Sequence, residues 1–264
     1  MEDWPSLAFE SFGLVTKVRC ESPETFAGVG EALPPGAHVR PSGEASATVT
    51  VDRFGAIAVD EEALVGPRLS VASAEYVLAQ LEMVLRRHVA RHAPEHIFIH
   101  AGVVGADGVG VVIPGGSMSG KSTLVSALVR RGATYYSDEY AVVDPGGLIH
   151  PYPKPLTPRS ARDPHRPIEP VHVSASRRAS APIRPGLIVL TRYERGASWS
   201  PKRLSAGAAA LALLENVVSD RSGPARAVGV VRALVGCAEV VSGARGDAEL
   251  AAREIVGLLR ASAA

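Results

Sequence analysis

The chain has 264 residues, of which 46% are hydrophobic and 21% are charged. This composition is typical of a globular protein with a large core, and it excludes a disordered tail, a coiled coil and a fibre. The 28 basic residues nearly balance the 27 acidic ones. A protein built to hold nucleic acid is usually far more basic, so nucleic acid is not expected as a partner.

Cysteine usage and the N-terminal sequence bear on the compartment. Cys20 and Cys237 form no CxxC pair and no disulfide framework, which favours a reducing environment. The first residues lack the basic and apolar regions of a signal peptide. No apolar stretch approaches the roughly 18 residues of a membrane-spanning helix. We therefore expect a cytoplasmic protein that does not interact with membranes.

The first part of the chain, residues 1–94, is expected to form a small α+β unit. A helix is predicted from Ala74 to His92, because apolar residues recur there every three or four positions. Ser73 can cap this helix and Pro94 ends it. Alternating or β-branched residues predict strands over three stretches, the last two joined by a turn at Gly55: residues 12–18, 47–51 and 56–59.

The second part, residues 95–264, has an alternating strand and helix rhythm that predicts an α/β core. Strands are expected at residues 96–104, 110–113, 134–137, 140–143 and 187–190. Helices are expected at residues 121–130, 206–218, 225–235 and 247–260. Residues 158–185 contain six arginines and many prolines without apolar periodicity. We expect this segment to be one long mobile loop that could close over a bound ligand.

The sharpest motif is the sequence G-G-S-M-S-G-K-S at residues 115–122, which matches the P-loop pattern G-x-x-x-x-G-K-[ST] at every fixed position. Backbone N–H groups of such a loop, together with the start of the following helix, attract phosphate. Lys121 is expected to reach the β- and γ-phosphates of ATP, and the Ser122 hydroxyl to ligate Mg²⁺. The nucleotide-binding residues expected from the motif are Gly115, Gly116, Ser117, Met118, Ser119, Gly120, Lys121, Ser122 and Thr123.

An acidic pair, Asp138 and Glu139, follows the P-loop after one predicted helix and one short strand. A return strand would bring the pair beside the phosphates, where one carboxylate could hold the metal and the other could accept a proton. An exposed turn is the alternative. Asp144, at the end of the next strand, is a rival metal ligand. The later strand at residues 187–190 has no carboxylate at its end, which disfavours a motor-type ATPase.

Three stretches give the chain a resemblance to a known family: Ile99-His100-Ala101, residues 111–124 and residues 132–140. They resemble the HPr serine kinase/phosphorylase family, and more closely the stand-alone HPr-kinase-like proteins of bacterial gene clusters, including those that modify lasso-peptide precursors. The resemblance covers about residues 97–159. It implies a P-loop kinase core related to phosphoenolpyruvate carboxykinase, with a mixed rather than an all-parallel sheet.

The resemblance also implies roles for single residues. Asp138 falls on the family's catalytic acid, His100 on a histidine near the acid pair, and Glu139 where the family usually has a second Asp. Lys154 and Arg159 lie in a stretch similar to the P-[KR]-x-L…R stretch of the HPr-kinase-like proteins, and both are expected to contact the nucleotide. A longer signature with an Arg-Gly element is absent from the chain, which argues against HPr phosphorylase activity.

Four histidines, His88, His92, His96 and His100, recur every four residues. Two of them would share a helix face, as in some zinc sites. Pro94 ends the helix before the third, and no Asp, Glu or Cys completes a constellation. We therefore expect a solvated helix end rather than a metal site.

These features predict an ATP- and Mg²⁺-dependent kinase that transfers the γ-phosphate to a hydroxyl, namely a serine of a peptide or small protein such as a peptide natural-product precursor. Asp138, His100 and Lys121 are the expected catalytic residues, and Ser122 and Glu139 the expected metal ligands. Two alternatives stay open: a small-molecule hydroxyl kinase and a nucleotide-dependent regulatory module with little turnover. The sequence does not decide between a monomer and a homo-oligomer.

Overall fold

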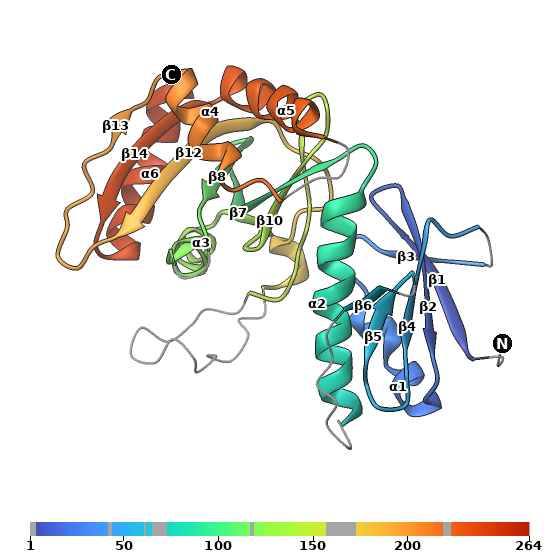
Figure 1. Cartoon of the computed structure of the whole chain (residues 1–264). Coiled ribbons are helices and arrows are strands. Elements are labelled where there is room, and N and C mark those ends of the chain that lie inside the picture. The colour runs from blue at the N-terminus through green and yellow to red at the C-terminus, as the bar shows by residue number, and fades with distance from the viewer. Residues whose placement is uncertain are drawn as a thin grey trace. The chain divides into compact units, whose positions relative to one another are not determined.

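The computed structural model describes residues 4–41, 44–60, 62–64, 73–116, 119–156, 173–218 and 223–263. The chain divides into two compact units, Met1–Glu95 and His96–Ala264 (Figure 1). The boundary lies one residue after the one expected from the sequence. No helix in the described ranges is both long enough and apolar enough to cross a bilayer.

The first unit contains a six-stranded mixed sheet in the order β3-β1-β2-β4-β5-β6. Strands β2 and β4 pair in parallel and the other neighbours are antiparallel. Phe12 and Gly13 have positive φ angles and form a turn, so the strand expected over residues 12–18 starts two residues later. The strands are β1 (Ser6–Ser11), β2 (Leu14–Cys20), β3 (His38–Arg40), β4 (Ala47–Val51), β5 (Ile57–Val59) and β6 (Glu62–Leu64).

Helix α2 (Ala74–His92) has the bounds expected from the sequence. The Ser73 hydroxyl accepts a hydrogen bond from the Tyr76 N–H at 3.3 Å, and thereby caps the helix. The apolar face is buried through Val77, Leu81, Leu85 and Val89. Two short helices of this unit were not predicted from the sequence: α1 (Pro23–Ala27) and η1 (Val29–Ala32).

The second unit contains an eight-stranded mixed sheet in which β11-β10-β7-β8-β12-β14-β13 is the strand order and β9 pairs with β7. Strands β8, β12 and β14 are parallel, so their carboxyl ends meet at one edge of the sheet. The other pairs are antiparallel. The strands are β7 (Ile97–Ala106), β8 (Val109–Pro114), β9 (Thr134–Ser137), β10 (Tyr140–Val143), β11 (Ile149–His150), β12 (Pro185–Tyr193), β13 (Lys202–Arg203) and β14 (Glu239–Arg245).

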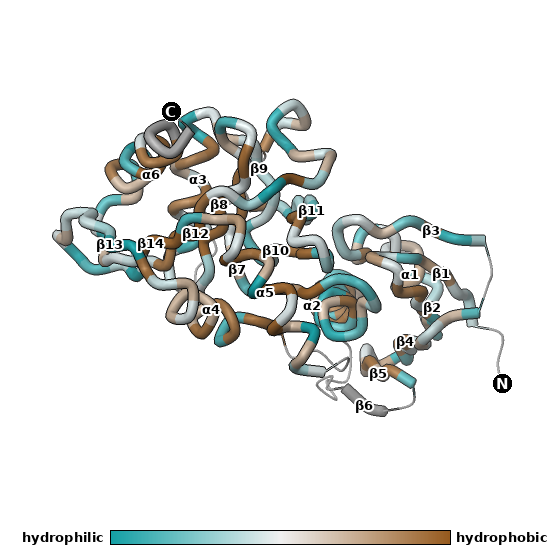
Figure 2. Tube along the Cα trace, turned by 90° about the horizontal axis from the view of Figure 1, so that it is seen from above, coloured by the Kyte–Doolittle hydropathy of each residue, from teal (hydrophilic) through white to brown (hydrophobic). Residues whose placement is uncertain are grey.

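Helices cover both faces of this second sheet, which makes the unit a three-layer α/β structure. Helices α3 (Lys121–Arg130) and α6 (Ala248–Ala263) pack into one apolar core. Helices α4 (Ala206–Leu214) and α5 (Pro224–Cys237) pack into the other. Figure 2 shows the central strands largely in the hydrophobic colour. The expected mixed α/β fold with a mixed sheet is therefore confirmed.

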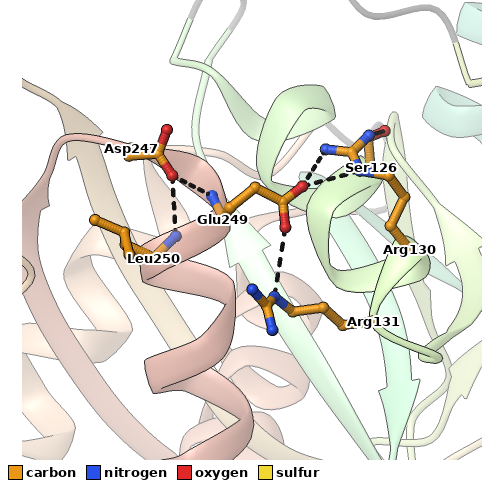
Figure 3. A network of polar contacts seen from close by, with 6 residues as sticks. All are labelled: Ser126, Arg130, Arg131, Asp247, Glu249 and Leu250. Carbon is orange, nitrogen blue, oxygen red and sulfur yellow. Dashed lines mark hydrogen bonds and ion pairs between the residues drawn. The ribbon is translucent and has the colours of Figure 1, made fainter.

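Polar contacts connect α3 to α6 on the surface (Figure 3). Arg130 donates to Glu249 Oε1 from Nε at 2.9 Å and from Nη2 at 2.6 Å. Arg131 Nε lies 3.4 Å from the second carboxylate oxygen of Glu249. Asp247 Oδ1 accepts from the Glu249 N–H and the Leu250 N–H, and thus caps the start of α6.

Part of the segment expected to be a mobile loop, residues 158–185, is built into the second sheet. A short helix, η2 (Ala175–Arg177), is followed by a bridge between Arg178 and Tyr135 of β9. Ile183 exchanges two backbone hydrogen bonds with Ile149, each 2.9 Å long. The expectation of one continuous loop is therefore wrong for residues 173–185, whereas residues 157–172 lie outside the described residues.

Candidate active site

The P-loop leaves the buried end of β8, and its backbone requires glycine at two positions. Gly115 has φ of 156°, and a Cβ there would lie 2.8 Å from Ser119 Oγ. Gly120 has φ of 82°, and a Cβ there would lie 2.4 Å from Arg245 Nη2. A side chain at either position would collide with its neighbour, so both glycines are needed for the loop to turn into α3. Of the expected nucleotide-binding residues, Ser117 and Met118 lie outside the described residues.

Lys121 begins α3 and lies over the start of the loop. Its ammonium group donates to the carbonyl oxygens of Gly115 and of Gly116, the latter at 2.7 Å. Burial lowers the pKa of Lys121, while the charges of Glu139 and Asp138 act to raise it. The Gly115 N–H donates to the His100 carbonyl at 3.1 Å, which fixes the loop to β7. A cation, a helix N-terminus and two carboxylates therefore meet at this loop.

The acid pair occupies a tight turn between β9 and β10. The buried Ser137 hydroxyl accepts hydrogen bonds from the Glu139 N–H at 3.1 Å and from the Tyr140 N–H at 3.0 Å. The Ala101 N–H of β7 donates to the Glu139 carbonyl at 3.3 Å. These bonds hold the turn against the strand next to β8. The structure thus brings Asp138 and Glu139 near Lys121, where their charges act on its ammonium group.

The surroundings of Asp138 combine a hydrogen bond from Tyr135 with nearby charges. The Tyr135 hydroxyl lies 3.1 Å from Asp138 Oδ1 and 2.6 Å from the Lys154 carbonyl oxygen. Burial raises the pKa of Asp138, and the Glu139 charge adds to this effect. Hydrogen bonds from Tyr135 and Ser122 and the charge of Lys154 oppose it, but the net shift is upward. A carboxyl group with a raised pKa is a stronger base once it is ionised, which suits proton abstraction.

His100 lies on β7 directly opposite Tyr140 of β10. The two rings are tilted at 45° with centroids 5.0 Å apart. His100 alternates with Ile99 and Ala101, which belong to the core under α4 and α5, so its side chain is on the sheet face that carries α3. The histidine is therefore on the same face as the P-loop helix, and its backbone carbonyl anchors Gly115.

The two rival metal ligands differ in their surroundings. Asp144 Oδ1 accepts from the Leu148 N–H, and Oδ2 lies 3.0 Å from His150 Nε2. Burial alone would raise the pKa of Asp144, but the hydrogen bonds from His150 and Leu148 lower it overall. Asp144 thus stabilises the turn before β11. Glu139, in contrast, is the carboxylate whose charge acts most strongly on Lys121.

The donor atoms around Ser122 fit a magnesium ion. The Ser122 hydroxyl acts as a hydrogen-bond donor to the Asp138 carboxylate. Glu139 directly follows Asp138 in the chain. Mg²⁺ prefers oxygen ligands and usually takes one or two carboxylates, with phosphates and water completing its shell. Within the described ranges, no group of three or more His, Cys, Asp or Glu forms an all-protein metal site. The oxygen donors at Ser122 therefore suit a metal that is shared with a phosphate ligand.

The three remaining expected site residues have different outcomes. Lys154 lies beside the acid pair, where its charge acts on Asp138 and its carbonyl accepts from Tyr135. Arg159 lies outside the described residues. Thr123 is exposed on the first turn of α3.

The histidine series separates into different environments. His88 and His92 stack on α2 with ring centroids 4.5 Å apart. Burial, assisted by the charge of His92, lowers the pKa of His88 to about 4, so this histidine is neutral near pH 7. His88 is thus a core residue, not part of the solvated helix end that the sequence suggests. His96 instead meets His150 edge-on at 4.8 Å.

Sequence reasoning missed Arg245 and Tyr193, which lie on the other side of the P-loop. Arg245 ends β14 and is only 2% exposed. Its Nη2 donates to the Gly120 carbonyl at 2.8 Å, and its Cζ lies 5.8 Å from the centre of the Tyr193 ring. Burial lowers the pKa of Arg245, against the charges of Tyr193 and Asp247. The available signal was weak: Arg245 is four residues after the short apolar run at Val240 and Val241.

A shallow cavity of about 400 Å³ lies elsewhere in the second unit. None of its lining residues belongs to the P-loop or the acid pair, so the candidate site is located by its side-chain chemistry and not by this cavity. The cavity is lined by Pro145, Arg226, Gly229, Val230, Arg232 and Ala233.

Comparison with known proteins does not assign the chain to a family. No protein-family model matches the chain, and no curated protein matches its sequence.

Proposed function

We propose that the protein is an ATP- and Mg²⁺-dependent kinase that transfers the γ-phosphate to a serine hydroxyl of a peptide or small protein, such as a peptide natural-product precursor. In this proposal the second unit is a P-loop kinase core of the HPr kinase/phosphoenolpyruvate carboxykinase type. The proposal rests on the P-loop motif and, for the acceptor, on the resemblance to HPr-kinase-like proteins.

One observation carries the proposal: the acid pair meets the start of α3, where the charges of Glu139 and Asp138 act on Lys121 and the Ser122 hydroxyl is a hydrogen-bond donor that lowers the pKa of Asp138. In P-loop proteins the hydroxyl at this position binds Mg²⁺, and it lies next to the β- and γ-phosphates of the nucleotide. A partly buried carboxylate with a raised pKa at that point is well placed to receive a proton from an acceptor hydroxyl. Lys121, from the same turn of helix, supplies positive charge.

The reaction assigns a distinct task to each residue. Lys121 and the loop N–H groups hold the phosphates and neutralise their charge. Asp138 takes the proton of the acceptor hydroxyl while the acceptor oxygen forms a bond to the γ-phosphorus. The bond between the γ-phosphorus and the oxygen that bridges it to the β-phosphate breaks at the same time, and ADP leaves. Ser122 and Glu139 would hold Mg²⁺, which supplies charge neutralisation when bound. His100 positions the loop through its carbonyl and lies on the same sheet face as α3.

Intact-mass spectrometry tests the proposal. The protein is incubated with Mg-ATP and a panel that contains peptides with internal and C-terminal serines, an HPr-type protein and a mixture of small metabolites, while ADP is measured in parallel. We expect a phosphate-sized mass gain on a serine peptide or small protein, and no gain with Lys121→Ala. A gain on a metabolite alone would instead identify a small-molecule kinase.

The matched control is Asp144→Asn, a carboxylate of the same unit that bonds to His150 instead of the loop. It should transfer phosphate at nearly the rate of the unaltered protein. Slow ADP release without any phosphorylated acceptor would contradict the kinase proposal and favour a nucleotide-dependent regulatory module.

A further inference from the structure

Tyr193 is an exposed aromatic residue beside the end of the P-loop. It is the last residue of β12 and pairs in register with Arg245 of β14. Its side chain is 58% exposed, and its Cβ lies 3.9 Å from the position that a Cβ on Gly120 would take. Residues 187 and 189 of the same strand belong to the core under α3 and α6. By the alternation of a strand, Tyr193 is therefore on the sheet face that carries α3.

Arg245 fixes the ring of Tyr193 to the loop. The guanidinium donates to the Gly120 carbonyl at 2.8 Å and to the Gly246 carbonyl at 3.3 Å, and it lies at cation–π distance from the Tyr193 ring. Arg245 Nε has no hydrogen-bond partner in the structure as described. A buried cation thus supports one side of an aromatic ring whose remaining surface is open. Such a ring is a preformed stacking platform.

The sheet order places this platform opposite the acid pair. Strand β8 leads into the P-loop. On one side of β8 lie β7, β9 and β10, and the turn between β9 and β10 contains Asp138. On the other side of β8 lie β12 and β14. A triphosphate whose γ-phosphate points to Asp138 extends along the loop, and its nucleoside end then leaves toward β12. Tyr193 is an exposed aromatic side chain on that side.

We propose that Tyr193 is the stacking residue for the base of the bound nucleoside triphosphate, and that Arg245 positions it. This inference rests on the proposed function, because it takes the P-loop as a nucleotide site. Bases stack on aromatic side chains with little dependence on base identity. Removal of the ring therefore weakens binding of the base but not of the phosphates.

Isothermal titration of the full-length protein separates these contributions. Two ligands are titrated in the presence of Mg²⁺: ATP, and inorganic tripolyphosphate, which has the phosphates without a base. Tyr193→Ala should weaken ATP binding by about tenfold or more and leave tripolyphosphate binding unchanged. Tyr193→Phe keeps the ring and should bind ATP nearly as well as the unaltered protein. The control is Phe54→Ala, which removes a ring of similar exposure, 56%, from the first unit.

Each other result has a definite meaning. If Tyr193→Ala leaves ATP binding unchanged, the base does not stack on Tyr193. If it weakens ATP and tripolyphosphate binding equally, the ring supports the loop and not the base, which also overturns the inference. Lys121→Ala is measured beside these variants and should weaken binding of both ligands. If it changes neither, the P-loop assignment fails, and the proposed function fails with it independently of Tyr193.

Discussion

The two sides of the P-loop differ in charge and in how they are built. On the β7–β10 side, Asp138 and Glu139 lie in a turn held by short-range bonds to Ser137. On the β12–β14 side, a buried arginine and an exposed tyrosine meet through the pairing of distant strands. A nucleotide bound between them would have its reacting phosphate at the acidic side and its base at the basic side. Under the proposed function, phosphate transfer depends on the acidic side of the loop and affinity for the base depends on the basic side.

The largest expected effect comes from the acidic side. Asp138→Asn keeps the shape of the side chain but removes the proton acceptor, so we expect phosphate transfer to fall by about 100- to 10,000-fold. The Kd for ATP should stay nearly unchanged, because the loop and Lys121 are intact. Single-turnover transfer and calorimetric binding of ATP, measured on the same preparation, check the two parts.

Glu139→Gln distinguishes the two carboxylates of the pair. If Glu139 holds the metal, its amide variant should need a higher Mg²⁺ concentration for half-maximal transfer and approach the original rate when Mg²⁺ is saturating. An Asp138→Asn variant that saturating Mg²⁺ also restores would show that Asp138 is the metal ligand and not the base.

Arg245→Met tests the basic side at the level of the loop. Methionine has a similar volume but cannot donate to the Gly120 carbonyl, so the start of α3 loses both a tether and a nearby positive charge. We expect the affinity for tripolyphosphate to fall by about tenfold, which corresponds to about 1.4 kcal/mol. The affinity for ATP should fall further, because Tyr193 also loses the cation that supports its ring. Thermal unfolding of the same variant shows whether the fold is kept. A loss confined to ATP would mean that Arg245 acts only through Tyr193.

The sequence predicted the regular elements around the site better than the contacts that complete it. Helices α2 and α3 were found with correct bounds because each has a clear apolar period. The strands β9 and β10 were also placed correctly, since they are bounded by turn residues. These local signals were enough to predict that Asp138 lies near Lys121, as it does in the structure.

Strand β14 shows why the basic side was not predicted. Gly243 and Ala244 weaken its apolar pattern, and its identity as a strand comes from pairing with β12, which is some fifty residues earlier in the chain. The burial of Arg245 follows from that pairing. A single sequence carries no local signal for such a contact, and the same holds for the bridges that bind residues 178 and 183 to β9 and β11.

Lys154 provides a smaller effect through the pH dependence of the acidic side. Burial raises the pKa of Asp138. The apparent pKa of the acidic limb of the pH–rate profile should therefore lie above the usual pKa range of an aspartate. The positive charge of Lys154 opposes this shift. Its removal in Lys154→Met raises the pKa of Asp138 further, and a greater fraction of the base is then protonated at a given acidic pH. The limb should therefore move to higher pH, as pH–rate profiles of kcat would show.

Arg177→Met is the matched control for that profile. Arg177 Nη1 donates to the Val129 carbonyl at 2.7 Å, at the far end of α3, and the residue is not among the groups whose charge shifts the pKa of Asp138. The acidic limb of the pH–rate profile of Arg177→Met should coincide with that of the unaltered protein. An unchanged limb in Lys154→Met would show that Lys154 does not influence the proton acceptor.

The smallest expected effect concerns the surface contacts between α3 and α6, at the end of α3 that is remote from the loop (Figure 3). Glu249 bonds to Arg130 and Arg131, but its side chain is 43% exposed and that of Arg130 57%. Water and salt screen such pairs, so Glu249→Gln should lower the free energy of unfolding by at most about 1 kcal/mol. Glu254→Gln, at an exposed position of the same helix, is the control in chemical denaturation. Because the apolar core between α3 and α6 stays intact, transfer activity should not change, and a loss of activity in Glu249→Gln alone would show that these exposed contacts position the start of α3.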